Sequence, residues 1–116
     1  MTVLRIVPDL ETPDPAAAQA FWGDILGLDC VMDQGWIATF EGQGTQKLQI
    51  SFASEGGNGT PVPAVSVEVD DLDTVLEAAD RQGLAPEYGP VTEPWGVRRA
   101  FLRDPAGHLV NVMTHI

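Results

Sequence analysis

Polar side chains that could bind or activate a small molecule alternate with apolar ones along four predicted strands of this 116-residue chain. Successive side chains of a strand point to opposite faces, so residues two apart share a face. The Leu, Ile and Val face of each strand must pack against helices, which leaves the other face for chemistry. The alternation places four sets of residues on that second face: Arg5, Val7 and Asp9; Lys47, Gln49 and Ser51; Ala64, Ser66 and Glu68; and Leu109, Asn111 and Met113.

Glu68 is the candidate for acid–base chemistry, because its carboxylate could act as a base; the alternative is a solvated or arginine-paired strand residue. His108 stands in an Asp-Pro-Ala-Gly-His sequence, which is typical of an exposed turn. His115 shares a face with Asn111 but lies where the strand frays. Cys30 has no histidine near it in sequence, and its place at the start of a strand predicts a buried structural thiol. We therefore predict no catalytic residue.

Two tryptophans and an arginine add binding groups. Trp36 stands just before a strand, and Trp95 lies in a Pro-Trp-Gly loop, so both can offer a flat ring and an indole donor to a ligand. For Trp95, a packing or dimer-interface role is the alternative. Arg98 and Arg99 alternate, so one faces the binding side and the other the helices or solvent. The pattern does not decide between them, and Arg98 is the one we carry forward as a ligand contact.

These residues are positioned by a plan that occurs twice in the chain. A strand runs into a helix capped by an Asp and ended by a Gly, and further strands follow. In the first helix, Ala18, Phe21, Ile25 and Leu28 recur at spacings of three and four, which predicts one face packed on a sheet, with Asp14 as N-cap and Trp22 packing beside them. The predicted elements are strands Val3–Leu10, Asp29–Val31, Trp36–Phe40 and Gln46–Phe52, then strand Ala64–Val69, helix Leu72–Gln82, a short extended piece after Pro86-Glu87-Tyr88-Gly89-Pro90, and strands Val97–Arg103 and Leu109–His115.

The two halves predict one α+β domain over residues 1–116. Module one spans residues 1–53, module two spans residues 63–116, and each has the order β-α-β-β-β. Residues 54–62 are rich in Gly and Pro and are predicted to form a mobile linker. The sequence leaves open whether residues 53–63 also act as a lid.

Charge and composition exclude several partners. Seventeen acidic residues stand against six basic ones, a net charge of -11, which argues against nucleic acid and anionic membranes but leaves cationic ligands open. No apolar run approaches the roughly 20 residues that span a bilayer, and the N-terminus lacks a signal-peptide pattern. With a single cysteine, these features predict a cytoplasmic protein.

Several motifs carry a resemblance to a known family. They are the paired modules, the Val67-Glu68-Val69-Asp70-Asp71-Leu72-Asp73 junction, the Phe21-Trp22 to Leu26-Gly27-Leu28 helix, and the stretch from Trp95-Gly96 to Asp104-Pro105-Ala106-Gly107-His108. Together they resemble the vicinal oxygen chelate superfamily of glyoxalases, bleomycin-resistance proteins and extradiol dioxygenases, over essentially the whole chain. The resemblance implies a cupped mixed sheet with helices on its outer face, and a homodimer. It does not select one function, because the superfamily hosts several enzyme classes and pure binding proteins.

The resemblance also implies where a metal would be held. The four ligand positions fall at Val7, Gln49, Ala64 and Asn111. An apolar Val, an Ala and two neutral amides are poor ligands for a hard divalent ion, so we expect no metal and no cofactor.

The resulting expectation is a metal-free small-molecule binding protein of the glyoxalase/bleomycin-resistance type, which sequesters a cationic or aromatic antibiotic-like ligand. Two alternatives remain: a divergent glyoxalase-like lyase or dioxygenase, and a structural dimer with a vestigial cup. The candidate ligand-binding residues are Arg5, Val7, Trp36, Gln49, Glu68, Trp95, Arg98, Asn111 and Met113.

Overall fold

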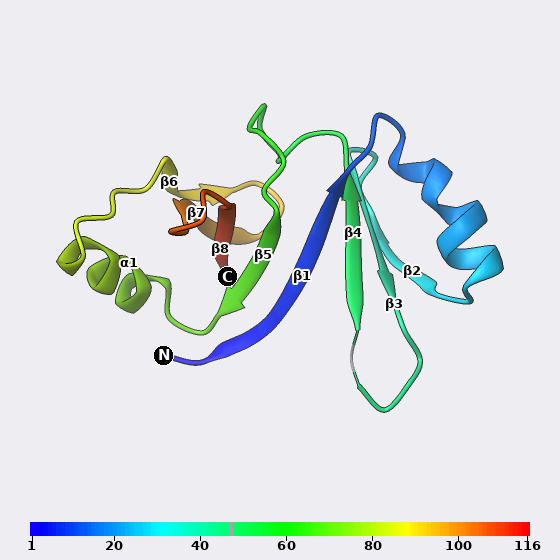
Figure 1. Cartoon of the computed structure of the whole chain (residues 1–116), viewed down its shortest axis with the longest axis horizontal. Helices are drawn as coiled ribbons and strands as arrows, with labels where there is room; N and C mark the ends of the chain where they lie inside the picture. Colours follow the sequence, from blue (N-terminus) through cyan, green and yellow to red (C-terminus); the bar gives the residue numbers. More distant parts are fainter. Residues whose placement is uncertain (47) are drawn as a thin grey trace. The chain divides into compact units, whose positions relative to one another are not determined.

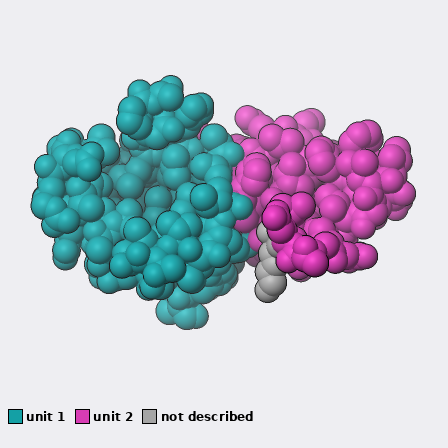
Figure 2. Space-filling model, turned by 60° about the horizontal axis from the view of Figure 1, so that its bottom comes forward, with its two compact units in different colours: residues 1–6, 63–116 teal, residues 7–62 magenta. Residues whose placement is uncertain are grey.

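The computed structural model describes residues 1–46 and 48–116, so Lys47 lies outside the described residues. The chain forms two compact units, shown in different colours in Figure 2. Unit 1 contains Met1–Ile6 and Pro63–Ile116, and unit 2 contains Val7–Val62. Strand β1 (Val3–Glu11) contributes its first residues to unit 1 and its last residues to unit 2.

Unit 2 is built on a sheet in the order β2-β3-β4-β1 (Figure 1). Its strands besides β1 are β2 (Asp29–Asp33), β3 (Ile37–Glu41) and β4 (Gln49–Ala53). Strand β4 pairs parallel with β1 and antiparallel with β3, and β2 pairs antiparallel with β3. Buried Ala38, Phe40 and Phe52 form its core. The other face carries the polar residues of the same strands, as the alternation predicts.

The helical segment of unit 2 differs from the predicted α-helix. It consists of a 3-10 turn, η1 (Pro15–Ala17), and a π-helix, η2 (Gln19–Ile25), and the Asp14 side chain makes no capping hydrogen bond. A π-helix closes its hydrogen bonds between residues five apart rather than four, and in this segment the side that meets the core carries Ala18 and Trp22. Phe21 and Ile25 are therefore 52% and 70% exposed, while Trp22 packs 5.1 Å from the Phe52 ring. The predicted apolar stripe is thus wrong at Phe21 and Ile25, and the packing role of Trp22 is confirmed.

Unit 1 has the strand order β1-β5-β8-β7-β6. Strand β5 (Val65–Val69) pairs parallel with β8 (Leu109–His115), and β7 (Val97–Arg103) pairs antiparallel with β8 and with β6 (Tyr88–Glu93). Helix α1 (Leu72–Arg81) begins after Asp71, whose side chain accepts a hydrogen bond from the Thr74 N–H (3.2 Å). Its apolar side covers the core of Val69, Leu72 and Val112. The α+β class, with a mixed sheet of parallel and antiparallel strands, is confirmed.

Two features depart from what the pattern suggests. Cys30 is exposed rather than buried, because it lies on β2, the edge strand of unit 2. Leu4 and Ile6 are 57% and 61% exposed, so the apolar face of β1 does not pack under a helix. Within residues 54–62, the Gly56 N–H donates to the Thr60 carbonyl (2.7 Å), and the mobile linker stays a prediction. Among the described residues, no helix is long and apolar enough to cross a membrane.

Candidate functional site

The candidate site is the polar face of unit 1, which is the side of its sheet opposite helix α1. Val67, Val69 and Val112 pack against α1, so the residues of opposite parity point away from the helix. The strand registers bring these residues side by side, since Ser66 lies opposite Asn111, and Met113 lies between Glu68 and Arg99. The face comprises Arg5, Ser66, Glu68, Arg99, Phe101, Asn111, Met113 and His115.

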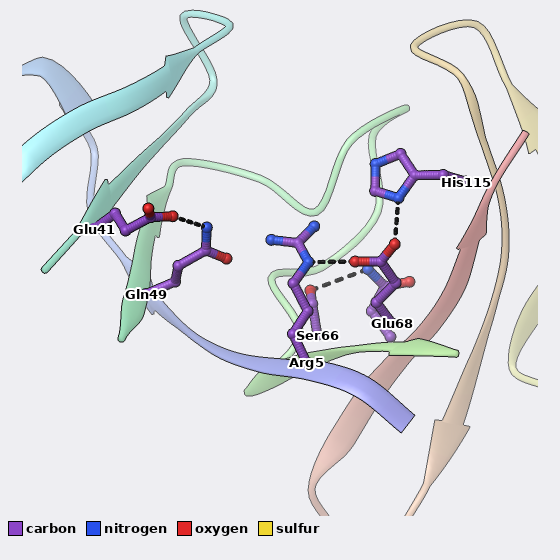
Figure 3. A network of polar contacts seen from close by, with 7 residues as sticks. Arg5, Glu41, Gln49, Ser66, Glu68 and His115 are labelled. Atoms are coloured by element: carbon purple, nitrogen blue, oxygen red, sulfur yellow. Dashed lines mark hydrogen bonds and ion pairs between the residues drawn. The ribbon is translucent and has the colours of Figure 1, made fainter. Parts of the chain in front are cut away.

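Glu68 is held by a base on each side (Figure 3). Arg5 Nε donates to Glu68 Oε1 (2.5 Å), and His115 Nδ1 lies 2.7 Å from Glu68 Oε2. Burial raises the pKa of Glu68, but the hydrogen bonds from Arg5 and His115 outweigh it and hold the pKa below its usual value. The carboxylate is therefore ionised at neutral pH and fixed in orientation.

Asn111 presents a buried acceptor that has no donor. Its side-chain Nδ2 donates to Ser66 Oγ (3.0 Å), and the residue is only 6% exposed. Within the described part of the chain, its Oδ1 has no hydrogen-bond partner. A buried unsatisfied polar atom costs about 1–3 kcal/mol, so native proteins rarely keep one without a reason. The polar face thus contains a positioned oxygen that an N–H or O–H group could satisfy.

Arg99 forms a buried hub beside these groups. Glu93 Oε2 accepts hydrogen bonds from Arg99 Nε (2.8 Å) and from the Tyr88 hydroxyl (2.9 Å), and both Arg99 and Glu93 are nearly inaccessible. The Arg99 guanidinium carbon also lies 4.9 to 5.3 Å from the ring centroids of Tyr88, Trp95 and Phe101. Cation–π attraction and the ion pair therefore hold the half-buried Trp95 ring against Arg99.

The structure decides which of the two neighbouring arginines belongs to this face. Arg98 Nη1 donates to Asp73 Oδ1 on α1 (2.9 Å), so Arg98 lies on the helix side of the sheet. Arg99 lies opposite Met113 on the polar face. The placement of Arg98 as a ligand contact therefore does not fit the geometry, because a one-residue step along a strand moves a side chain to the other face.

The remaining sequence candidates lie in unit 2, on a polar face of its own. Gln49 Nε2 donates to Glu41 Oε2 (2.6 Å; Figure 3), and Thr39 Oγ1 lies 2.8 Å from Ser51 Oγ. Val7 is buried on the same face. Trp36 precedes β3, and its carbonyl accepts a hydrogen bond from the Ser54 N–H (2.9 Å).

Unit 1 brings five of the sequence candidates together on or beside its polar face: Arg5, Glu68, Trp95, Asn111 and Met113. Sequence reasoning gave little weight to three further residues: Ser66, Arg99 and His115. Strand parity already placed Ser66 and His115 on the same face as Asn111, and this signal was sufficient to find them. The link between His115 and Glu68 spans 47 positions, and no local pattern reveals it.

The side chains do not fit the family's metal. Of the implied ligand positions, unit 2 supplies Val7 and Gln49, and unit 1 supplies Ala64 and Asn111. The Gln49 amide is already bound to Glu41, and Ala64 has no donor atom. Within residues 1–46 and 48–116, no group of three or more His, Cys, Asp or Glu residues could hold an ion. The polar face therefore offers hydrogen bonds and charge rather than a metal-binding array.

Comparison with protein families settles the relationship of the chain. A model described as the Glyoxalase/Bleomycin resistance protein/Dioxygenase superfamily matches residues 4–112. The chain belongs to this superfamily. The search among curated proteins found no significant match.

Several solved structures share its fold. A superfamily member from Vibrio splendidus 12B01 has a TM-score of 0.67 at 17% identity, covering 99% of this chain and 100% of that one. A Streptomyces coelicolor methylmalonyl-CoA epimerase variant has a TM-score of 0.69 at 19% identity, covering 98% and 96%. A Legionella pneumophila protein described as an NAD-dependent benzaldehyde dehydrogenase has a TM-score of 0.76 at 12% identity, covering 97% and 100%. At these identities the likeness is one of fold alone.

Proposed function

We propose that this glyoxalase-superfamily chain is a small-molecule binding protein that holds its ligand on the polar face of unit 1 without a metal. The observation that carries the proposal is the buried Oδ1 of Asn111, which has no hydrogen-bond donor within the described residues. Oδ1 is covered in the free protein, so a ligand N–H or O–H group would reach it only when a neighbouring side chain moves aside, and the desolvation cost of the oxygen is already met.

The surroundings of Asn111 suit a ligand that is cationic or aromatic. The net charge of -11 speeds the encounter with a positively charged molecule. Trp95, held by Arg99, offers an indole ring at the edge of the same face. These groups stand on strands paired in one sheet, so little ordering is required when a ligand binds. The ligand class is thus a cationic or aromatic natural product of the kind that a resistance protein sequesters.

The test is a ligand screen with a matched pair of variants. Cationic and aromatic natural products, bleomycin among them, are titrated against the protein and followed by tryptophan fluorescence. For any ligand that binds, Asn111→Leu is expected to weaken binding about tenfold, the equivalent of one hydrogen bond to a buried acceptor. Thr114→Val on the opposite face of β8 is the control and should bind as the wild type does. Equal binding by the Asn111→Leu variant would contradict the proposal.

A second candidate function is catalysis by a metal-free enzyme. The observation that favours it is the ionised Glu68 carboxylate in contact with the His115 imidazole, an arrangement that can accept and return a proton. Sequestration leaves the ligand chemically unchanged, whereas catalysis converts it. Mass spectrometry of ligand recovered after long incubation distinguishes the two, and conversion that disappears in Glu68→Gln would establish the enzyme.

We also propose that two copies of the chain associate as a homodimer. Leu4 and Ile6 on β1, and Phe21 and Ile25 on the π-helix, are all more than half exposed, and large exposed apolar groups mark interaction surfaces. A symmetric dimer would cover such residues with their own counterparts.

The exposed thiol of Cys30 is compatible with the reducing cytoplasm that the sequence indicates.

A further inference from the structure

We infer that the Asn58–Gly59 bond is the site at which this chain deamidates, and that Glu55 slows the reaction in the folded protein by holding the Gly59 N–H. The inference is independent of the proposed binding function and concerns the segment that joins β4 to β5. The observation that carries it is the hydrogen bond from the Gly59 N–H to Glu55 Oε1 (2.9 Å), because this nitrogen is the atom that would react.

Deamidation joins the backbone nitrogen of Gly59 to the side chain of Asn58. The nitrogen loses its proton to a hydroxide ion and attacks Asn58 Cγ, so that an N–Cγ bond forms, the Cγ–Nδ2 bond breaks and ammonia leaves. Water then opens the resulting cyclic imide at either carbonyl, which yields aspartate or isoaspartate. Both products add a negative charge, and isoaspartate also lengthens the backbone by a methylene group.

The two asparagines of the sequence differ in the residue that follows. Asn58 precedes a glycine, which has no side chain to block the attack; both residues are exposed, and the space beside the Gly59 Cα is open. Asn111 precedes the β-branched Val112, and both are buried in β8. Asn58 is therefore the reactive position, and Asn111 serves as an internal control.

Glu55 opposes the first step of the reaction. The Gly59 nitrogen must lose its proton before it attacks, and a carboxylate that accepts the N–H stabilises the protonated form. The nitrogen must also turn towards Asn58 Cγ, which breaks the hydrogen bond to Glu55. Both effects slow the reaction only while the segment keeps this local structure.

Further hydrogen bonds hold the backbone on either side of the reactive bond. The Gly56 N–H donates to the Thr60 carbonyl (2.7 Å), and the Thr60 N–H donates to the Gly57 carbonyl (3.1 Å). The Thr60 hydroxyl donates to the same Gly57 oxygen (2.7 Å). Asn58 itself has a φ of 55°, in the left-handed region that asparagine tolerates better than most residues. Rotation of the Asn58–Gly59 peptide group disturbs these contacts, so deamidation requires the segment to open locally.

The test compares deamidation in the folded and the unfolded chain. The full chain is incubated in mildly alkaline buffer with and without concentrated urea, and Asn58 is followed by peptide mass spectrometry and an isoaspartate assay. We expect the rate constant at Asn58 to be at least about tenfold lower without urea, the factor that one hydrogen bond can provide. Asn111 should stay unmodified in the folded chain and should be the slower of the two in urea.

Variants assign the protection to Glu55. Glu55→Ala removes the acceptor and should raise the rate in the folded chain about three- to tenfold. Glu55→Gln keeps a side-chain oxygen in the same place and should react more slowly than Glu55→Ala. Glu77→Ala, which removes an exposed carboxylate on helix α1, is the matched control and should react as the wild type does. In urea all of these proteins should react at the same rate.

Each other outcome overturns the inference. Equal rates in the folded and unfolded wild type would show that the fold does not protect the bond. Equal rates for Glu55→Ala and the wild type would exclude Glu55, and a difference that persists in urea would assign it to the local sequence. Hydrogen exchange of the Gly59 N–H tests the hydrogen bond without a substitution, and exchange at the rate of an unstructured peptide would contradict it.

Discussion

His115 Nδ1 lies 2.7 Å from Glu68 Oε2, although the two residues are 47 positions apart in the chain. The parallel pairing of β5 with β8 brings their strands together, and Arg5 holds the other oxygen of the same carboxylate. The contact links β8, the last strand of unit 1, to the ionised Glu68 carboxylate. The charge of Glu68 therefore contributes to the stability of the folded protein.

Glu68→Gln should change how stability varies with pH. The folded protein holds the pKa of Glu68 below its ordinary value, because the hydrogen bonds from Arg5 and His115 outweigh the burial that raises it. Such a carboxylate stabilises the fold above the ordinary pKa of a glutamate, about 4.3, and the stabilisation is lost as the pH falls through the lower folded value. The wild type should thus be more stable than the variant at pH 7, and the difference should shrink below about pH 4. Urea unfolding at a series of pH values measures it, and a constant difference would contradict the prediction.

Arg99→Met should be the most destabilising single change on the polar face. Removing the guanidinium leaves Glu93 buried without its cation, which typically costs about 3–5 kcal/mol. The Trp95 ring also loses its support, so its fluorescence should shift to the red. The matched control is Arg98→Met, whose partly exposed pair with Asp73 should contribute less than about 1 kcal/mol. Similar losses in the two variants by urea unfolding would show that Arg99 is not a structural hub.

Regular strand patterns made most of the fold predictable. The bounds predicted for Val97–Arg103 and Leu109–His115 agree with β7 and β8. The alternation of apolar and polar residues along a half-buried strand shows where the strand lies and which side chains face the core. The Asp cap and the Gly end of α1 were equally readable from sequence, since both depend on neighbouring residues. The π-helix was not predictable, because its apolar spacing resembles that of an ordinary α-helix.

The sequence predicted which residues share the polar face, but not the hydrogen bonds and ion pairs among them. Parity placed Glu68 and Asn111 on one side of the sheet, and the registers agree. Parity could not choose between Arg98 and Arg99, because only a long-range contact, such as the one between Arg98 and Asp73, shows which arginine meets the helix. The missing partner of Asn111 Oδ1 is a property of three-dimensional packing, and no sequence pattern records it.

Asn111→Leu should separate binding from stability. The substitution removes a buried acceptor that has no donor within the described residues, and it replaces it with an apolar side chain of similar volume. Removal of the unsatisfied oxygen is stabilising and loss of the hydrogen bond from Nδ2 to Ser66 Oγ is destabilising, so we expect the melting temperature to change by no more than a few degrees, while ligand affinity falls. Differential scanning calorimetry measures the first effect and the ligand titration the second. A loss of stability above about 1 kcal/mol would mean that the amide serves the fold instead.

Ile6→Lys should convert a dimer into a monomer. Ile6 is 61% exposed on the apolar side of β1, and a charge there would have to be buried in a face shared by two copies. Analytical ultracentrifugation should give twice the chain mass for the wild type and the single mass for the variant. Leu84→Lys, which changes an exposed apolar residue after helix α1, is the matched control and should remain dimeric. A monomeric wild type at micromolar concentration would remove the dimer proposal, and a dimeric Ile6→Lys variant would move the interface away from this side of β1.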